Sequence, residues 1–411
     1  MKNVPKIRFK GFTDAWEQRK VTDIGKIFIG LVTTMTENYA NKGTLLIRNS
    51  DIQDGQFVLK ENPIYLKNSF AETNKSRRHK LGDIITVHTG DVGTSAVISE
   101  NEVNSIGFAT IVTRPNNKLV DSNFICSFLN THKHKSIALK LSTGDGRTNY
   151  NLKDYSKLEV PICSLREQQK LANIITTLSN LITLHQRKCE QLKTLKKFLL
   201  QKMFPENGNE KPELRFTGFT DAWELRKLGD VADIVGGGTP NTNNKLYWNG
   251  NINWYSPTEI SDQTYLESSQ RKISDIGYKN CSAKILPKGT VLFTSRAGIG
   301  KTAILLKEGC TNQGFQSIVP HKNSLDSYFI FSRSLELKKY AETVGAGSTF
   351  IEVSRKQMHE MKLMLPTFFE EQKNIGIFFK NIDNLITLHQ RKCEELKKVK
   401  QYLLQNMFPQ E

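Results

Sequence analysis

The sequence predicts an α+β fold in which two mixed α/β domains are joined by two long helices that pair as an antiparallel coiled coil. Two repeats predict it. The segment Leu181 to Pro205 recurs as Leu385 to Pro409, with 19 of 25 positions identical at an offset of 204. The segment Pro5 to Lys20 recurs as Pro212 to Lys227, with 12 of 16 positions identical at an offset of 207. The stretches between the repeats are unlike one another, so one duplicated frame carries two different inserts.

The repeats divide the chain into six segments. In order they are an N-terminal repeat segment (1–24), a first domain (25–160), a central helix (161–205), a linker with the second repeat segment (206–229), a second domain (230–365) and a C-terminal helix (366–411). The short repeat follows the central helix directly, whereas its other copy stands at the N-terminus. Pseudo-twofold symmetry therefore predicts a cyclic arrangement. The N-terminal segment should pack near the end of the second helix, with Trp16 and Trp223 in similar surroundings.

Composition indicates the class of protein and of partner. With 411 residues, the chain is long enough for two or three domains that each bury a core. Its net charge of +17 favours a polyanionic partner, nucleic acid first and an anionic membrane second. No apolar run is long enough to span a bilayer, and the start lacks the apolar core of a secretory signal. The six cysteines form no CxxC pair and no metal-like spacing, so we expect no metal site and a reducing, cytoplasmic location.

Each long repeat has the apolar stripe of a helix that pairs with another. The stripe follows a 3-4 spacing over four heptads, which favours a coiled coil over a lone surface helix. From Arg166 to Met203 the first helix would have 38 residues and a length of about 57 Å. The residues predicted at the seam are Leu178, Leu181, His185, Leu192 and Leu199 with Ile382, Leu385, His389, Leu396 and Leu403. The two histidines either set the register of the helices or extend to solvent at a loose point in the seam.

The starts of both helices carry a capping pattern. Ser164 is followed three residues later by Glu167, and Thr367 is followed by Glu370. In a capping box the glutamate side chain bonds the backbone at the start of its own helix. We therefore expect each glutamate to cap its own helix.

The inserts predict mixed α and β structure with Gly-rich turns. The β-favouring runs are Asp83–His88, Ala96–Ser99 and Ala109–Thr113 in the first insert, and Gly289–Phe293, Ala303–Leu306 and Ser317–Val319 in the second. Leu81 to Ile85 corresponds to Leu286 to Leu292, and a turn that contains glycine follows each segment. The two domains are therefore expected to share a fold while their loops differ.

Several motifs point to chemistry that the chain lacks. Gly300-Lys301-Thr302 looks like the end of a phosphate-binding loop, but that loop needs a glycine where Ser295 stands, and a helix after it. Asn62-Pro63-Ile64-Tyr65 looks like the motif with which amino-methyltransferases hold an amine, but it lacks a second proline and a cofactor-binding fingerprint. We find no metalloprotease, nucleophile-elbow or nuclease motif. His132 and His134 are expected on a solvated face. No catalytic residue is assigned.

The remaining candidates bind rather than catalyse. Arg and Lys neutralise phosphates, Arg pairs with guanine, and Asn or Gln pairs with adenine. Loops that carry both kinds of residue suit a protein that recognises DNA sequence, although a solvated surface explains any single one of them equally well. The DNA-binding candidates are Arg77, Arg78, Lys80, Arg147, Thr148 and Asn149 in the first insert and Thr239, Asn241, Arg271, Arg296 and Lys301 in the second. The pair Trp254-Tyr255 is more typical of a core than of a platform for stacked bases.

The duplicated segment PxxRFxGFTDAWExRK and the duplicated helices resemble the specificity (S) subunit of Type I restriction-modification systems. Two details of the second insert also resemble that family. They are Gly-Gly-Gly-Thr-Pro with Tyr247-Trp248-Asn249-Gly250, and Arg296 to Ile304 with Asn312-Gln313-Gly314-Phe315. In the first insert, His88 to Gly93 stands where the Arg-Ala-Gly turn would be. The resemblance covers essentially the whole chain.

This resemblance implies a DNA-binding subunit without catalytic activity. The inserts would be target-recognition domains, each reading one half of a bipartite, asymmetric site in double-stranded DNA. The helices would fix the unread spacer and dock two modification subunits, which methylate adenine with S-adenosylmethionine. Restriction subunits would add an ATP-dependent, translocating endonuclease. S-adenosylmethionine, ATP and Mg would thus belong to partner subunits, with no cofactor bound by this chain.

Two other functions fit parts of the sequence. A stand-alone fused restriction-methyltransferase would need a methyltransferase or nuclease motif, and none is visible. A helical scaffold that only binds protein would show weak DNA affinity that depends on salt but not on sequence.

Overall fold

The computed structural model describes residues 4–32, 36–53, 55–59, 62–142, 149–206, 209–261, 263–296, 298–345 and 352–409. The chain forms two compact units. Unit 1 comprises Met1–Gln186 with Gln390–Glu411, and unit 2 comprises Arg187–His389. Two helices of 38 residues each, α6 (Leu165–Lys202) and α12 (Phe369–Asn406), contribute one part to each unit. Observed α6 begins and ends within one residue of the predicted span.

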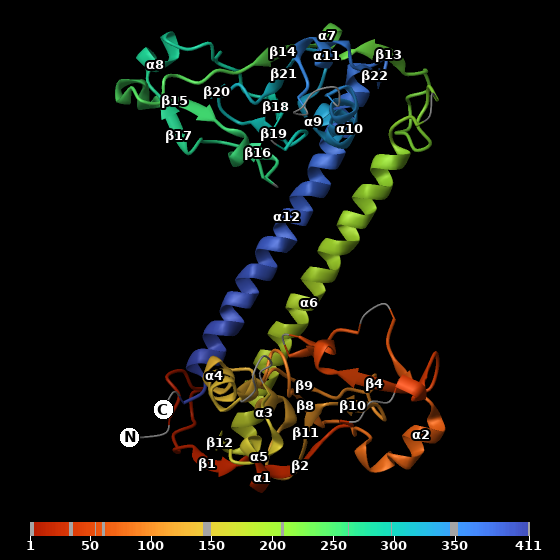
Figure 1. The fold of residues 1–411 in the computed structure, drawn as a ribbon, viewed down its shortest axis with the longest axis vertical. Helices are drawn as coiled ribbons and strands as arrows, with labels where there is room; N and C mark the ends of the chain where they lie inside the picture. Colours follow the sequence, from red (N-terminus) through yellow and green to blue (C-terminus); the bar gives the residue numbers. More distant parts are fainter. Residues whose placement is uncertain are drawn as a thin grey trace. The chain divides into compact units, whose positions relative to one another are not determined.

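The elements of each unit follow the chain (Figure 1). Those of unit 1 are β1 (Glu17–Lys20), α1 (Val21–Ile24), β2 (Gly25–Ile29), β3 (Tyr39–Ala40), β4 (Thr44–Arg48), β5 (Ile52–Gln53), β6 (Gln56–Phe57), β7 (Tyr65–Leu66), α2 (Asn68–Thr73), β8 (Ile84–Val87), β9 (Ser95–Val97), β10 (Ile106–Phe108), β11 (Thr110–Pro115), α3 (Ser122–Leu129), α4 (His132–Leu141), α5 (Leu152–Tyr155) and β12 (Glu159–Ile162). Those of unit 2 are β13 (Glu224–Lys227), α7 (Leu228–Val231), β14 (Ala232–Gly236), β15 (Trp248–Tyr255), β16 (Tyr265–Leu266), β17 (Arg271–Ile273), α8 (Asp275–Lys279), β18 (Val291–Phe293), β19 (Thr302–Leu305), β20 (Cys310–Thr311), β21 (Gln316–Pro320), α9 (Ser327–Ser332), α10 (Ser334–Gly345), α11 (Arg355–Glu360) and β22 (Lys362–Leu365).

The two units share a fold, as the sequence predicted. The main sheet of unit 1 has the order β2-β11-β8-β9, and that of unit 2 has the order β14-β21-β18-β19-β16. A smaller sheet in each unit contains one parallel pair, β4 with β10 in unit 1 and β15 with β20 in unit 2. In each unit the strand that ends the short repeat pairs antiparallel with the strand before the long helix, β1 with β12 and β13 with β22. All six predicted strands are present, as β8, β9, β11, β18, β19 and β21.

Equivalent aromatic clusters confirm the predicted similarity of Trp16 and Trp223. In unit 1 the Trp16 ring lies 5.6 Å from that of Phe124 and 5.9 Å from that of Phe408, which follows α12. In unit 2 the Trp223 ring lies 5.9 Å from that of Phe329 and 6.1 Å from that of Phe204, which follows α6. Phe408 and Phe204 occupy equivalent repeat positions, so the N-terminal segment does pack at the end of α12.

Each short repeat also binds the start of a long helix through a buried ion pair. The Arg8 guanidinium donates to both carboxylate oxygens of Glu167 at 2.7 and 2.8 Å, and Arg215 donates to those of Glu371 at the same distances. The hydrogen bond with Glu167 raises the pKa of Arg8. The predicted capping box is therefore half formed at α6, where Glu167 N donates to Ser164 Oγ at 3.4 Å, and is wrong at α12, which begins at Phe369. The Glu167 side chain binds a distant arginine, and Glu370 forms an exposed pair with Lys373.

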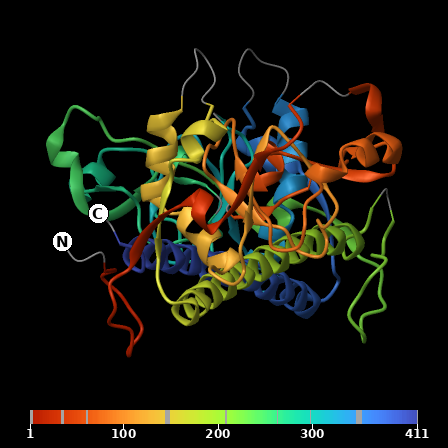
Figure 2. The ribbon, with the colours of Figure 1, turned by 90° about the horizontal axis from the view of Figure 1, so that it is seen from below.

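The two long helices run antiparallel in unit 2, where they lie side by side (Figure 1, Figure 2). Lys196 Nζ lies 2.6 Å from the Asp383 carboxylate, and the rings of Phe204 and Phe379 are 6.0 Å apart. Residue numbers therefore rise along α6 in the direction in which they fall along α12. This direction agrees with the predicted antiparallel pairing.

The seam differs from the prediction at two of the ten predicted positions. Leu181 and Leu385 are wrong, because they are 38% and 45% exposed, whereas the next residues, Ile182 and Ile386, are buried. The helical repeat turns neighbouring side chains about 100° apart, so one step along the chain moves a residue off the seam. Leucine and isoleucine stand side by side here, and an apolar pattern does not separate them. The other predicted seam residues are buried or half-buried: Leu178, His185, Leu192, Leu199, Ile382, His389, Leu396 and Leu403.

Replacing Glu371 with Gln should lower the free energy of unfolding of unit 2 by about 3–5 kcal/mol, because the buried Arg215 loses its charged partner. Urea denaturation measures this loss. The matched control is Glu370→Gln at the neighbouring exposed carboxylate, where an ion pair contributes about 0–1 kcal/mol. Equal losses in the two variants would contradict a special role for the buried pair.

Candidate nucleic-acid interface

A tight turn projects from the main sheet of each unit at the same place. In unit 2, between β18 and β19, Thr294 N donates to Lys301 O at 3.0 Å and Gly300 N donates to Thr294 O at 2.9 Å. In unit 1, between β8 and β9, Val87 N donates to Thr94 O at 2.8 Å and Gly93 N donates to Val87 O at 3.0 Å. Both glycines have positive φ, 88° and 83°, which suits a residue without a Cβ. His88 to Gly93 thus takes the place of the Arg296 turn, as the sequence predicted.

The turn of unit 2 gathers polar side chains from two other loops. Thr239, beyond the end of β14, donates its hydroxyl to Gln313 Oε1 at 2.5 Å. The backbone N of Ser295 donates to the carbonyl of Gly314 at 2.8 Å. Arg296 lies 3.9 Å from Glu352, and both side chains are well exposed. Lys301, the residue before β19, is exposed. The structure therefore brings together three of the predicted residues, Thr239, Arg296 and Lys301, with Gln313 and Glu352, which the prediction omitted.

An arginine and two tryptophans form the neighbouring part of this surface. Trp254 Nε1 donates to Gly238 O at 2.8 Å, and Trp248 Nε1 donates to Asn241 O at 3.2 Å. The Arg271 guanidinium lies 3.6 Å from the centre of the Trp248 ring, in cation–π contact. Trp254 and Tyr255 are buried, in agreement with the core role favoured by the sequence. Arg271 and Asn241 are exposed and so remain candidates for contact with DNA.

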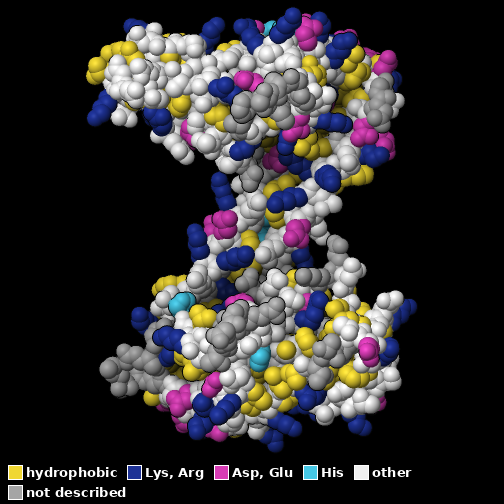
Figure 3. Space-filling view, viewed as in Figure 1, with side chains coloured by type: hydrophobic (Ala, Val, Ile, Leu, Met, Phe, Trp, Pro, Cys, Tyr) yellow, Lys and Arg dark blue, Asp and Glu magenta, His cyan; other side chains and the backbone are white. Residues whose placement is uncertain are grey.

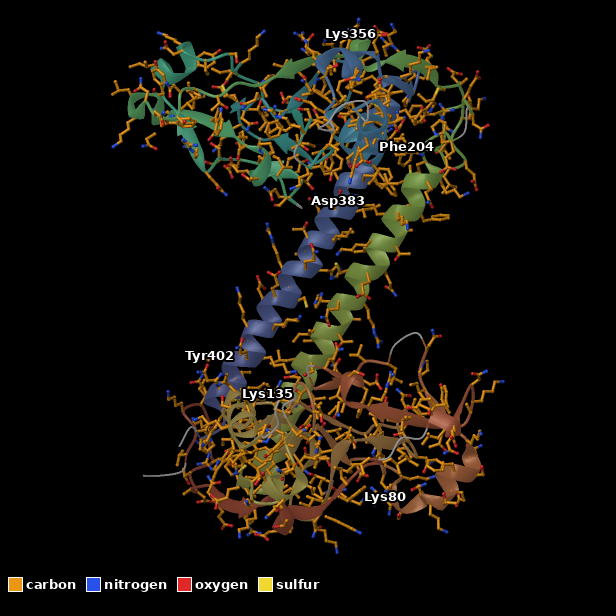
Figure 4. All side chains as sticks on the ribbon, in the orientation of Figure 1. Lys80, Lys135, Phe204, Lys356, Asp383 and Tyr402 are labelled. Carbon is orange, nitrogen blue, oxygen red and sulfur yellow. The ribbon has the colours of Figure 1, made fainter. Side chains whose placement is uncertain are left out.

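The basic run of unit 1 is divided between structural and exposed roles. Arg77 Nη1 donates to the carbonyls of Ile29 and Gly30 at 2.6 and 2.7 Å, where it holds the end of β2. Arg78 lies 3.0 Å from Glu72. Lys80 is exposed (Figure 4). A contact of these residues with DNA stays a prediction, and the partners of the two arginines leave Lys80 as the most accessible of the three.

The turn of unit 1 has a different polar set from that of unit 2. His88 Nδ1 and Thr89 Oγ1 are 2.7 Å apart, and Thr89 donates to Asn149 Oδ1 at 2.8 Å. His88 N donates to Asn49 Oδ1 at 3.0 Å. Arg147 and Thr148 lie outside the described residues. The same backbone geometry therefore presents a histidine, a threonine and asparagines in unit 1, and an arginine, a glutamine and a lysine in unit 2.

Two histidines of unit 1 are buried and neutral. His79 Nδ1 lies 2.8 Å from Ser105 Oγ, and burial lowers the pKa of His79 to about 4. Burial also lowers the pKa of His134 to about 4. The expectation of a solvated face is wrong for His134, whose ring packs against Phe128 and Tyr150, and right for the exposed His132. The buried histidines stabilise the fold rather than contact a ligand.

The surface charge of both units is widely distributed. Figure 3 shows Lys and Arg side chains spread over the drawn face of each unit rather than gathered in one patch. Within the described residues, no group of three or more His, Cys, Asp or Glu could hold a metal ion. None of the helices formed by those residues is long and apolar enough to cross a membrane.

Comparison with known proteins identifies the family. A family model described as the Type I restriction modification DNA specificity domain matches residues 13–194 and again residues 220–398. The chain belongs to this family. Each match covers the second half of one short repeat, one insert and most of one long helix, so the duplication seen in the sequence is a duplication of the family domain.

Similar proteins agree with this assignment. The putative type I restriction enzyme MjaX specificity subunit of Methanocaldococcus jannaschii is 23% identical over 412 residues, which cover 98% of this chain and 95% of that protein. The type I restriction enzyme MjaIX specificity subunit of the same organism is 34% identical over 189 residues, but the match spans only 44% of that protein and 45% of this chain. A crystal structure of a Type-I restriction-modification system S subunit from M. genitalium superposes with a TM-score of 0.67 at 14% identity, covering 99% of this chain and all of that one. This likeness shows the fold.

Unit 1 should lose stability as the pH falls from about 6.5 to about 4. In that window the unfolded chain takes up protons on His79 and His134 while the folded chain does not, so acid favours unfolding. Each histidine contributes roughly 3 kcal/mol at most to this loss. His79→Gln should flatten the dependence of the unfolding midpoint on pH, measured by urea denaturation at several pH values. The exposed His132→Gln is the control, and an unchanged slope in His79→Gln would contradict the assignment.

Proposed function

We propose that this chain is the DNA specificity subunit of a Type I restriction-modification complex and is not itself catalytic. Each unit carries one target-recognition domain, and each domain recognises one half of a bipartite, asymmetric site in double-stranded DNA. The observation that supports this most strongly is the pair of equivalent turns, which have the same backbone hydrogen bonds but present different side chains. Two readers of one fold with different contact residues suit two different half-sites.

The chemistry around the turn of unit 2 suits direct readout of bases. Gln presents a donor and an acceptor that match the adenine edge, and Arg pairs with guanine through two hydrogen bonds. The Thr239 hydroxyl donates a hydrogen bond to Gln313, and the Arg271 guanidinium packs on the Trp248 ring. Side chains held in this way lose little entropy on binding, which favours specific over non-specific contacts.

Gln313→Ala should weaken binding to the cognate site by about 5- to 100-fold, because one base loses its hydrogen-bond partner. Binding is measured by competition with duplexes randomised one position at a time, at fixed salt. We expect relaxed preference at positions of one half-site only. The control is Gln201→Ala at an exposed position of α6. A uniform loss across all sequences would indicate a backbone contact and contradict the proposed readout.

Repeated apolar side chains outside the seam support the docking of two copies of a protein partner. In unit 1, Leu184 is 61% exposed, and in unit 2 its repeat equivalent, Leu388, is also 61% exposed. The exposed apolar side chains next to the seam are Leu181, Leu184, Val399 and Tyr402 in unit 1 and Leu385, Leu388, Leu195 and Phe198 in unit 2. On both helices these residues lie to the same side of the seam. Antiparallel pairing places that side of one helix next to the same side of the other helix. Tyr402, on the C-terminal part of α12, is labelled in Figure 4.

We infer that each of these two apolar patches docks one modification subunit, and that restriction subunits join the complex through further contacts. Because the sequence repeat makes the two patches equivalent, they suit a partner that is present in two copies. S-adenosylmethionine, ATP and Mg then belong to the partner subunits, which carry out methylation, translocation and cleavage.

Leu184→Glu should remove one docked modification subunit and leave the other, because a charge replaces the apolar centre of one patch. Leu388→Glu should do the same at the second patch, and the double variant should bind neither. Size-exclusion chromatography with light scattering gives the mass of each complex. DNA binding by the chain alone should stay unchanged as the control for folding. Two subunits bound to the double variant would contradict this assignment.

A further inference from the structure

One side chain at the same place in each of the two equivalent turns contacts a segment that comes much later in the chain. Arg296 is the second residue after Thr294, whose backbone closes the turn of unit 2. Thr89 is the second residue after Val87, whose backbone closes the turn of unit 1. Because the closing bonds of the two turns have the same spacing in the chain, Arg296 and Thr89 occupy equivalent positions.

The segment that each turn contacts is also equivalent in the two units. In unit 1, Tyr150 N donates to His88 O at 2.9 Å, and in unit 2, Val353 N donates to Ser295 O at 3.1 Å. Each donor directly precedes the residue that caps a short helix, α5 in unit 1 and α11 in unit 2. The backbone bond therefore holds the residue before each donor beside the turn.

These two placements create one contact pair in each unit. In unit 2, Arg296 lies 3.9 Å from Glu352, and their side chains are 40% and 43% exposed. In unit 1, the Thr89 hydroxyl donates to Asn149 Oδ1 at 2.8 Å, and both residues are half-buried. The pair is thus charged in one unit and neutral in the other, at the same place on the same fold. A contact that is kept while its chemistry changes suits two domains that recognise different bases.

We propose that each pair recognises a single base pair, and that Arg296 with Glu352 selects G·C while Thr89 with Asn149 selects A·T. This inference rests on the proposed function. In the major groove, arginine donates to the two acceptors of guanine, and glutamate accepts from the amino group of the paired cytosine. Asparagine bonds the adenine edge, and the threonine methyl group packs on the methyl group of thymine. Two side chains in contact reach neighbouring base edges, since successive base pairs are about 3.4 Å apart.

Glu352 also acts against the wrong DNA. Its carboxylate faces the Arg296 guanidinium, so the arginine gains from leaving it only where guanine offers two acceptors in exchange. A thymine in place of cytosine would present an acceptor to the carboxylate and leave that charge unpaired, which penalises the wrong base pair. The negative charge also weakens the attraction of this surface to phosphates of any sequence.

The pair of unit 2 is tested with Arg296→Gln and Glu352→Gln in the full-length chain, by competition with duplexes randomised one position at a time at fixed salt. Both variants should reduce the preference for G·C at the same position of one half-site by about 5- to 100-fold. Affinity for a non-specific duplex should fall in Arg296→Gln and rise in Glu352→Gln, because the two variants remove charges of opposite sign. A purely structural role of the pair would not produce these opposite shifts.

The matched control is another exposed ion pair of unit 2, Lys307 with Glu267, whose charged atoms are 2.9 Å apart. Lys307→Gln and Glu267→Gln make the same changes of charge and should leave every base preference as in the wild type. Equal relaxation of the G·C preference in these controls would contradict the assignment to Arg296 and Glu352.

An exchange of the pair tests unit 1. Thr89→Arg combined with Asn149→Glu gives unit 1 the pair of unit 2, and methylated adenines are mapped in a host that carries this variant and the partner subunits. One position of one half-site should change from A·T to G·C, while the other half-site stays as in the wild type. The unchanged half-site then shows that the variant folds and assembles.

The outcomes separate this inference from the proposed function. Relaxation of distant positions by Arg296→Gln and Glu352→Gln, relaxation at a position that is not G·C, or no change in either variant overturns the inference and leaves the proposed function in place. An exchanged unit 1 that still selects A·T does the same for Thr89 and Asn149. A wild-type chain without any base preference would overturn the proposed function as well.

Discussion

The buried ion pair between a short repeat and the start of a long helix holds the frame of each unit together. In unit 1, Arg8 binds Glu167 near the start of α6, while the neighbouring Ile7 N donates to Asn406 O at the end of α12. In unit 2, Arg215 binds Glu371 near the start of α12, and Leu214 N donates to Lys202 O at the end of α6. Each short repeat thus joins the start of one helix to the end of the other. Trp16 and Trp223 fill the space that this junction encloses.

This constraint separates the parts of the protein that are fixed from the parts that differ. The junctions use only repeated residues and helix ends, so the loops of the main sheets do not contribute to them. The turns at Gly93 and Gly300 have the same backbone geometry with different side chains. A duplicated frame can therefore carry two different recognition surfaces, as expected of a family whose members specify DNA sites. The Lys196–Asp383 pair shows that the frame itself has also diverged, since unit 1 replaces the acid with Ser179.

Much of the fold follows from local sequence patterns. The repeats predicted the two helices, the cyclic placement of the N-terminal segment and a shared domain fold, because repetition of sequence implies repetition of contacts. The seam was misassigned at Leu181 and Leu385 because an isoleucine follows each leucine, and only the partner helix decides which one is buried. Glu167 was expected to bond the backbone of its own helix. Its actual partner, Arg8, was missed because it is distant in the chain and leaves no local signal. For the same reason the bond from Thr239 to Gln313, and the protein partners of Arg77, have no local signal.

The central claim is that the frame sets the spacing of the half-sites while the loops choose their bases. It is tested most directly by deleting one heptad from each long helix at equivalent positions, 185–191 and 389–395, which preserves the seam pattern. Seven residues shorten a helix by about 10.5 Å, or about three base pairs of duplex. Methylated adenines are then mapped genome-wide in a host that carries the variant and the partner subunits. The account predicts the same two half-sites with a spacer about three base pairs shorter. Altered bases with an unchanged spacer would contradict it.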